Sequence, residues 1–394
     1  MYRFLIAWML LSMTATFSFA ASEVTLNSDI ASGWGNSPWL KSMKYGYKDY
    51  GYRIVSKQDG HPVRFGNQSV RFEVRPGDCG SDESWDDCAN DRERHELSQI
   101  ADLQESGDEF WFSWSVYIPD GTPSISPTIT DLGQFHQKKN NVLFMFKWNE
   151  LGYVIDNQTP GDGTNKGMKP LVALHETTGR WIDILIHAKW SDRDDGFLIA
   201  YADHRKAYEF FGQTLAKGDH SFYKFGIYRS WLSRYKDAKN SPDVPAQTVY
   251  FDEVHRGSSL RSVDRVGLAE LQSIAAKKGY YTGSIDGVWG PNTLQAVNRL
   301  LSDKSIAPVH QYSMEIWNSL HKPEIPPQPQ PEFAGHFIAL KNELTKGEPN
   351  LVREWQTYLL SIGLYRGAID GQYSPHLKDA LVECMVSGAC KFGK

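Results

Sequence analysis

Between residues 24 and 259 the chain alternates apolar and polar positions in short runs, as in a β-strand with one buried face. The clearest runs are rich in β-branched and aromatic residues and lie at 69–75, 109–118, 181–188 and 248–254. Turn signals such as Pro119-Asp120-Gly121 separate the runs, and helical periodicity is almost absent. This pattern predicts a mainly β domain over residues 21–260, a two-sheet sandwich of the jelly-roll type.

The pattern changes near Arg261, where Leu- and Ala-rich helical periodicity begins and a repeat appears. Residues 279–287 (GYYTGSIDG) align with residues 363–371 (GLYRGAIDG). Each copy follows an amphipathic run and precedes a helix with proline near its start, at Pro291 and Pro375. The carboxy-terminal part is therefore predicted to contain two small all-α modules.

The two modules are predicted at 266–322 and 336–394, joined by a stiff Pro-rich linker at 323–335. They resemble the small three-helix peptidoglycan-binding modules attached to many bacterial wall enzymes. The first copy carries the resemblance through Leu271-Gln272, Gly279-Tyr280-Tyr281, Ile285-Asp286-Gly287 and Gly290-Pro291-Asn292-Thr293.

This resemblance implies that peptidoglycan is a partner, with Tyr281, Asp286 and Trp289 as its binding residues. The second copy departs from the pattern at Tyr373-Ser374-Pro375, which puts wall binding by that copy in question. The alternative for the aspartates is structural. Asp286 and its counterpart Asp370 would then only cap the turn of the loop that joins the helices.

The amino terminus has the layout of a secretory signal. Met1-Tyr2-Arg3 is a short basic lead, residues 4–17 are mostly apolar, and Ser18-Phe19-Ala20 is a small-x-small cleavage site. We expect residues 1–20 to be removed and the protein to be periplasmic or secreted, associated with the cell wall. A retained anchor is the alternative, but the run is short for a bilayer span, so no stable membrane insertion is expected.

The four cysteines form two close pairs in the sequence, Cys79 with Cys88 and Cys384 with Cys390. In an exported protein each pair is expected to form a disulfide that closes a local loop. Two pairs of free thiols are the alternative. Neither pair has the spacing or the histidines of a zinc site.

Three predicted strands carry polar functional groups at alternate positions, in the runs 92–97, 134–136 and 223–228. Successive side chains of a strand point to opposite faces. Three sets of residues therefore share a face within their strand: Arg92, Arg94 and Glu96; Gln134 and His136; Lys224, Gly226 and Tyr228. If these faces line one concave sheet, cations, an amide, an imidazole and a phenol converge on one groove.

These runs, in this order, resemble the jelly-roll polysaccharide lyases, the group that includes glucuronan lyase, heparin lyase I and the alginate lyases of this fold. The alginate lyases carry Arg-x-Glu-Leu, Gln-x-His and Tyr-Phe-Lys-x-Gly-x-Tyr strands. Their counterparts here are Arg94-His95-Glu96-Leu97, Gln134-Phe135-His136 and the run from Phe222 to Tyr228. The first aromatic pair is reversed and Ile227 stands where Asn is common, but the second tyrosine is kept as Tyr228.

The resemblance implies β-elimination at a 4-linked uronate of an acidic polysaccharide. The C5 proton is too weakly acidic to be removed until the adjacent carboxylate is neutralised, a task for which Gln134 and Arg94 are the candidates. His136 is the candidate base and Tyr228 the candidate acid for the O4 leaving group. In relatives one tyrosine sometimes performs both proton transfers, and the sequence does not decide between the two schemes.

Each candidate also has a structural alternative. Arg94 is equally suited to pairing with Glu96 or Glu73, Lys224 to a solvated position, and His136 and Tyr228 to the core. Two other functions stay open: a lectin-like envelope protein without catalysis, and a glycoside hydrolase on the same sandwich. The hydrolase needs two carboxylates across the sugar, and no strand presents such a pair at alternate positions.

Charge and metal sites add little. The formal net charge is −5, so an acidic polymer must be attracted by a local basic cleft, for which we name Arg92, Lys147, Lys224 and Arg229 as substrate-binding candidates. No nucleic acid is expected as a partner, and the chain is expected to be a monomer. No cofactor is expected for the chemistry. The run 82–87, which lacks EF-hand spacing, and Asp252 are candidates for a structural calcium ion.

Overall fold

The computed structural model describes residues 23–34, 37–161, 166–321, 344, 348–361, 364–365 and 367–386. The predicted signal peptide and the predicted linker lie outside the described residues. The chain forms two compact units that divide between Leu320 and His321. The first unit contains all the strands and the first group of repeat helices, and the second contains the second group.

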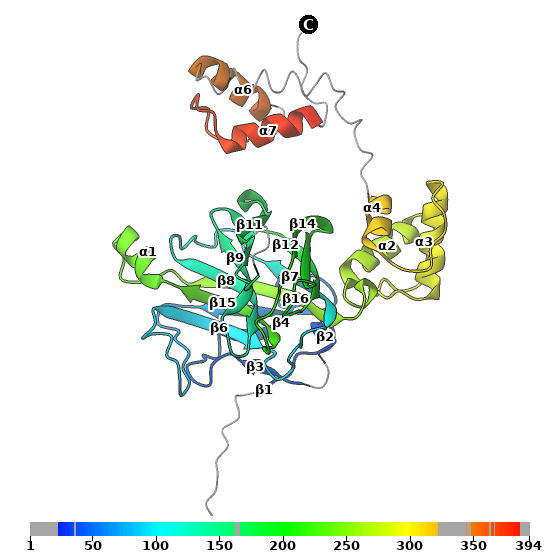
Figure 1. Ribbon diagram of the computed structural model, residues 1–394. Coiled ribbons are helices and arrows are strands. Elements are labelled where there is room, and N and C mark those ends of the chain that lie inside the picture. Colours follow the sequence, from blue (N-terminus) through cyan, green and yellow to red (C-terminus); the bar gives the residue numbers. More distant parts are fainter. Residues whose placement is uncertain are drawn as a thin grey trace, which may run out of the picture. The chain divides into compact units, whose positions relative to one another are not determined.

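The first of two sheets, sheet A, is antiparallel throughout (Figure 1). Its strands stand in the spatial order β1 (Glu23–Val24), β3 (Trp39–Lys41), β6 (Arg92–Ser98), β15 (Ser221–Ser230), β8 (Ile129–Gln137), β9 (Val142–Asn149), β10 (Gly152–Asn157) and β11 (Gly167–Val172). The three motif strands of the sequence, β6, β15 and β8, are therefore immediate neighbours.

Sheet B has the spatial order β14 (Arg205–Phe211), β13 (Phe197–Ala202), β12 (Trp181–Lys189), β7 (Glu109–Tyr117), β16 (Gln247–Gly257), β5 (Gln68–Val74) and β4 (Tyr52–Ser56). These pairs are antiparallel, and the short β2 (Ala31–Ser32) adds to β16 in parallel. The helices α1 (Leu232–Lys239), η1 (Leu174–Glu176) and η2 (Leu260–Ser262) are short pieces that connect or follow strands.

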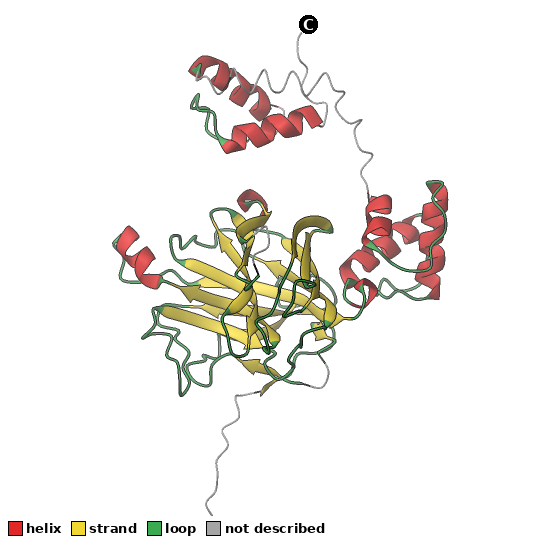
Figure 2. Cartoon of the chain, in the orientation of Figure 1, coloured by secondary structure: helices red, strands yellow, loops and turns green. Residues whose placement is uncertain are grey.

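The chain crosses repeatedly between the two sheets, because β5, β6, β7 and β8 alternate between sheet B and sheet A. Crossing of this kind is the jelly-roll way of building a sandwich. Aromatic side chains fill the space between the sheets, among them Phe72, Trp114, Phe135, Tyr223 and Phe225. Figure 2 shows that strands make up the body of the first unit. The prediction of a mainly β sandwich is confirmed.

The helices of the first unit follow the predicted repeat pattern. They are α2 (Arg265–Lys277), α3 (Pro291–Asp303) and α4 (Met314–His321), and α3 begins at the proline that the sequence marks as a helix start. Apolar residues from all three helices share one core, which includes Leu271, Leu300 and Ile316. In the second unit, α6 (Pro349–Ser361) and α7 (Pro375–Val386) pack through a separate core.

A buried glutamine holds the loop of each repeat. The Gln272 side chain donates to Tyr281, Asp286 and Val288 O, and accepts from the backbone of Gly287. In the second unit Gln356 makes the corresponding bonds to Tyr365, Asp370, Gln372 O and the backbone of Gly371. These bonds stabilise each loop internally and match the structural alternative for both aspartates.

The first group of helices packs directly on the outer face of sheet B. Leu185 points away from the sandwich core by strand alternation, yet it is buried, because it belongs to the same apolar cluster as the helices. Trp111 and Tyr201 of the same sheet pack against this cluster. The helices are therefore fixed to the sandwich by a shared core in addition to the covalent connection.

A buried ion pair reinforces this contact. His204 Nε2 lies 2.9 and 3.0 Å from the two carboxylate oxygens of Asp264, which also accepts from Tyr312 Oη at 2.5 Å. The His204 ring stacks on Trp317 at 4.2 Å. Burial opposes ionisation of both groups, but their mutual attraction outweighs it, raising the pKa of His204 and lowering that of Asp264.

We predict that His204→Asn destabilises the first unit in a pH-dependent way. Asn accepts the left-handed backbone of position 204, where φ is 61°, but it leaves Asp264 as an unpaired buried charge, at a cost of about 3 kcal/mol near pH 6. The wild-type pair contributes fully below the unfolded pKa of histidine. Its contribution is lost as pH rises through the raised folded pKa, so the two proteins should converge at high pH.

Thermal unfolding of both proteins as a function of pH measures this difference. The control is His175→Asn, since His175 lies on the surface 3.9 Å from Glu176 and should contribute little. A destabilisation that is the same at every pH would show that His204 is not charged in the folded protein.

Candidate active site

The face of sheet A that is turned away from the sandwich core, called the groove face after the groove that the sequence predicts, brings the three sequence motifs together. The register places Tyr228 opposite Arg94, and Lys224 opposite Gln134. His136 follows on the same face of β8, opposite Phe222. The predicted convergence of cations, amide, imidazole and phenol on one sheet face is therefore present in the structure.

Three register shifts shape this face, one of them between Phe135 and His136 in the pairing of β8 with β9. The pairing of β15 with β8 shifts between Phe225 and Tyr228, and β8 pairs with β9 irregularly between Asp131 and Gly133. As a result Asp131 lies opposite both Tyr228 and Lys147, although it is three residues from Gln134 and strict alternation would place it on the core face. A bulge of this type commonly redirects a side chain beside an active site.

Glu96 is the centre of the buried layer under the groove. Its carboxylate accepts from Gln134 Nε2 at 2.6 Å, and it pairs with Lys224 Nζ at 2.9 Å and Arg94 Nη1 at 3.4 Å. Burial opposes ionisation of Glu96, but the charges of Lys224 and Arg94 lower its pKa below the usual value. Glu96 is therefore a charged anchor that holds two cations and an amide at one point.

Arg94 is positioned chiefly by Asp87. Its Nε and Nη2 donate to the two Asp87 oxygens at 2.7 and 2.5 Å, which is a bidentate pair, and its guanidinium lies 4.3 Å from the Tyr228 ring centre. The sequence suggested Arg94 as a ligand of the substrate carboxylate. In the structure its Nε and Nη2 are engaged by Asp87, and its guanidinium lies against the Tyr228 ring.

A disulfide closes the loop that carries Asp87. Cys79 and Cys88 are bonded, as predicted, and Asp87 also accepts from the backbone of Gly80 across the same loop. Cys384 is disulfide-bonded in the core of the second unit, and its predicted partner Cys390 lies outside the described residues.

The Tyr228 side chain is partly exposed on the groove face. Arg92 Nε donates to its phenol oxygen at 3.0 Å, which leaves the phenol proton available to another acceptor. Burial raises the pKa of Tyr228 above its usual value, although Arg94 and Arg92 act in the opposite direction. The phenol therefore stays protonated at neutral pH, as a general acid requires.

His136 is also half-exposed and has a defined tautomer. Its Nδ1 lies 2.5 Å from the carbonyl oxygen of Gln137, which can only accept, so Nδ1 carries the proton and Nε2 keeps its lone pair. Burial, assisted by the charge of Lys224, lowers the pKa of His136 to about 4. The imidazole is therefore neutral at neutral pH and able to accept a proton.

Two predicted substrate-binding cations have other roles in the structure. Arg229 is fully buried on the opposite face of β15 from Tyr228, where it pairs with Glu93, because adjacent strand residues point to opposite faces. Lys147 lies on the groove side but is buried, with Nζ 2.5 Å from Asp156. Arg92 and Lys224 lie on the groove face, where Arg92 donates to Tyr228 and to the carbonyl oxygens of residues 90 and 91, and Lys224 is buried against Glu96.

The structure also brings to the site three residues that the sequence did not indicate, Asp131, Asp156 and Trp231, and it brings Asp87, which the sequence marked only as part of a calcium candidate. Asp131 is the most unusual, since neither of its oxygens has a hydrogen-bond partner among the described residues and Lys147 Nζ lies 4.0 Å away. Burial raises the pKa of Asp131 to about 7, against the attraction of Lys147. Its signal in the sequence was masked because the bulge breaks the alternation.

The calcium candidates are surrounded by donors. Asp252 accepts from the backbone N–H groups of Arg64, Phe65 and Glu253. In the part of the chain that the structure describes, no cluster of three or more His, Cys, Asp or Glu side chains suits a metal ion. The described helices likewise include none that is long and apolar enough to cross a membrane.

The groove face thus carries a neutral histidine, a protonated tyrosine and buried cations on one sheet. A family model described as polysaccharide lyase matches residues 45–255, which is more than half of the chain. The chain therefore belongs to the polysaccharide lyase family, and the enzyme is a polysaccharide lyase.

Solved structures with similar folds include three lyases of low identity. The endo-β-1,4-glucuronan lyase of the fungus Trichoderma reesei is 14% identical with a TM-score of 0.41, and the match covers 56% of this chain and 93% of that one. The family 7 alginate lyase AlgAT5 is 14% identical with a TM-score of 0.38, and the match covers 59% of this chain and 98% of that one. An alginate lyase from Klebsiella pneumoniae is 10% identical with a TM-score of 0.34, and the match covers 49% of this chain and 82% of that one. No curated protein matches the chain.

We predict that Asp131→Asn changes the pH dependence of stability. The stability of the variant relative to the wild type should be greater at pH 8 than at pH 5. The folded state holds a proton on Asp131 up to about pH 7, whereas the unfolded state releases it near pH 4, so wild-type stability falls as pH rises through this interval. Asn does not titrate, and the variant should gain at least about 1 kcal/mol on the wild type between the two pH values.

Denaturant unfolding at both pH values provides the measurement, with the exposed Asp194→Asn as the matched control. An Asp131→Asn variant that loses stability at pH 8 as much as the wild type does would mean that Asp131 is already ionised in the folded protein.

Proposed function

We propose that this lyase cleaves a 4-linked, uronate-containing acidic polysaccharide by β-elimination. The observation that carries the proposal is that the paired strands β8 and β15 present His136, a neutral imidazole that can accept a proton, and Tyr228, a protonated phenol that can donate one, on the same sheet face as Glu96. Proton removal and leaving-group protonation need one group of each kind.

The buried layer supplies donors for the substrate carboxylate. Gln134 has two N–H donors and Lys224 has three, and Glu96 takes one from each, so both keep donors for an anionic ligand. Removing the C5 proton builds charge on the carboxylate, and donors held in place before the reaction stabilise that charge. Gln134 and Lys224 are the proposed neutralising groups, with Arg92 at the Tyr228 end.

In the proposed reaction, His136 Nε2 takes the C5 proton and the C4–C5 double bond forms as the C4–O4 bond breaks. Tyr228 Oη transfers its proton to O4. The imidazolium and tyrosinate that result return to the starting state when the proton moves from one to the other, directly or through water. The other scheme, in which Tyr228 both removes and delivers a proton, uses the same phenol without His136.

We predict that Tyr228→Phe and His136→Ala each reduce kcat/KM by at least about a hundredfold, because each removes a proton-transfer group. The assay is ultraviolet absorbance of the unsaturated uronate product from glucuronan, alginate and heparin-type polymers. Tyr45→Phe, at an exposed tyrosine, is the control.

The outcomes separate the alternatives. Activity retained in His136→Ala but lost in Tyr228→Phe would assign both transfers to Tyr228. Unchanged activity in Tyr228→Phe would remove it as the acid. A wild-type protein that binds these polymers without producing unsaturated uronate would support the lectin-like function. The hydrolase has less support, since the groove-side carboxylates Glu96, Asp131 and Asp156 are buried among cations.

We further propose that the enzyme is exported and held at the cell wall by its repeat helices. The Cys79–Cys88 disulfide supports export, since such bonds persist in oxidising compartments. The recurrence of one Gln-Tyr-Asp network in both repeats supports a common origin for them. Peptidoglycan is the partner that the module resemblance implies.

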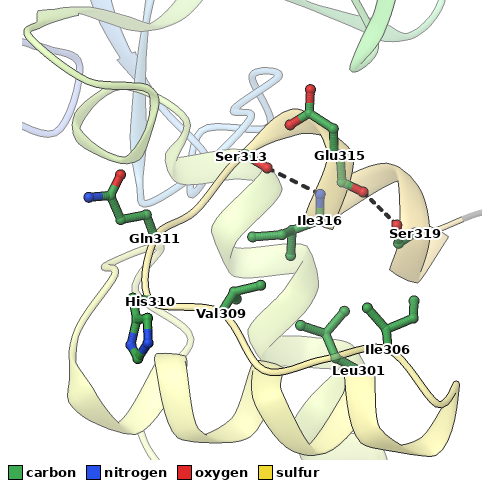
Figure 3. A pocket seen from close by; sticks show the side chains of 9 residues that line it. All are labelled: Leu301, Ile306, Val309, His310, Gln311, Ser313, Glu315, Ile316 and Ser319. Carbon is green, nitrogen blue, oxygen red and sulfur yellow. Dashed lines mark hydrogen bonds between the residues drawn. The ribbon is translucent and has the colours of Figure 1, made fainter.

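A pocket of about 680 Å³ in the first group of helices offers a binding position (Figure 3). It lies between the end of α3, the segment that follows and α4, and Leu301, Ile306, Val309 and Ile316 give it apolar walls. The residues predicted to bind peptidoglycan, Tyr281, Asp286 and Trp289, do not line it. Tyr281 and Asp286 serve the Gln272 network, and Trp289 packs on Tyr312.

We predict that the full chain sediments with insoluble peptidoglycan and that a chain ending at residue 321 sediments less, because it lacks the second repeat. Lyase activity of the shortened chain is the control for folding of the first unit. A full chain that stays in the supernatant would refute wall attachment, and equal sedimentation of both chains would assign binding to the first unit.

A further inference from the structure

Trp231 is an exposed aromatic residue with a strained backbone at the end of the catalytic strand. It follows β15 directly, three residues after Tyr228, and 44% of it is exposed. Its φ of 64° is a left-handed conformation that bulky residues rarely adopt. Such conformations persist where surrounding contacts impose them, and they cluster at functional sites.

The backbone around Trp231 is held by several hydrogen bonds. Its N–H donates to Asp91 O at 3.1 Å and its carbonyl accepts from Thr128 Oγ1 at 2.7 Å. The next helix, α1, is anchored because Leu232 is buried in a small cluster with Ile125 and Val244. The indole is therefore displayed at a fixed position on the surface and is not required for packing of the core.

Two guanidinium groups lie over the indole ring. Arg92 Cζ is 4.1 Å and Arg234 Cζ is 4.8 Å from the ring centre, which is within cation–π range. A guanidinium stacked on an aromatic ring keeps its N–H donors directed outward in its own plane, where they match a carboxylate. The exposed Arg234 side chain makes no hydrogen bond or ion pair with any described residue, so its fork is unoccupied.

Trp231 with its two stacked arginines, called the platform below, is connected through Arg92 to Tyr228, the proposed acid. The Arg92 guanidinium lies over the Trp231 ring, and its Nε–H donates to Tyr228 Oη at 3.0 Å. If the O4 atom of the cleaved bond lies at Tyr228, the neighbouring sugar of the polysaccharide therefore lies beside the platform.

We propose that Trp231, Arg92 and Arg234 form a subsite for an acidic sugar next to the one that is cleaved. Arg234, held by Trp231, pairs with the carboxylate or sulfate ester of that sugar, and Arg92 links the subsite to Tyr228. This inference rests on the proposed function for the identity of the polymer. It predicts that the subsite contributes to polymer binding rather than to bond cleavage.

The test uses the full chain, with glucuronan, alginate and heparin-type polymer as probes. Trp231→Ala and Arg234→Gln should each raise KM about tenfold with kcat changed less than about twofold, and Trp231→Phe should retain most of the binding. Lys239→Gln removes a charge from the same helix without contact to the indole and is the matched control. The polymer whose binding depends most on Arg234 distinguishes carboxylate from sulfate recognition.

Binding is also measured without turnover, by affinity electrophoresis of Tyr228→Phe with and without Trp231→Ala. Weaker binding of the double variant supports the subsite even if the wild type makes no unsaturated product, an outcome that would refute only the proposed reaction. Equal binding of the two variants, or failure of Tyr228→Phe to bind any of the three polymers, overturns the subsite whatever the activity.

Discussion

The site depends on one buried carboxylate, that of Glu96. An ionised carboxylate is costly to bury unless cations and hydrogen-bond donors compensate it, and here Arg94, Lys224 and Gln134 do so. These three groups come from β6, β15 and β8, so the requirement to satisfy one charge fixes the relative position of three strands. Loss of any partner would leave the others with unbalanced charge, which makes the layer a unit.

The arrangement also shows how cations are held on one face of a protein whose formal net charge is −5. The groove side of sheet A alternates cations and carboxylates, and the cations outward of this layer, such as Arg92, keep donors for a ligand. Under the proposed function, the local placement of these cations attracts the acidic polymer, because nearby charges act more strongly than the average charge of the surface.

Strand alternation made much of this site predictable from the sequence. Because side chains alternate between the two faces of a strand, the sequence places Arg94, Gln134 and Tyr228 each on a definite face of its strand. In the structure all three lie on the face so predicted. The same rule places Arg229, the neighbour of Tyr228 in the strand, on the opposite face, where the structure has it paired with Glu93.

Other site residues had no local signal in the sequence. Asp131 reaches the groove face only because a bulge interrupts the alternation, and Asp87 lies in a loop whose position depends on a disulfide and a distant arginine. Trp231 follows the end of a strand, where periodicity no longer assigns a face. The helix starts at Pro291 and Pro375 were predictable because the missing N–H of proline is a local property.

The Cys79–Cys88 bond is connected to the Tyr228 phenol through a series of contacts. The bond closes the loop that holds the Asp87 carboxylate, that carboxylate holds the Arg94 guanidinium, and the guanidinium lies on the Tyr228 ring. A newly made chain in a reducing compartment lacks the first member of this series. Reduction of the bond would release this loop, so the position of the phenol depends on the oxidised state of the two cysteines.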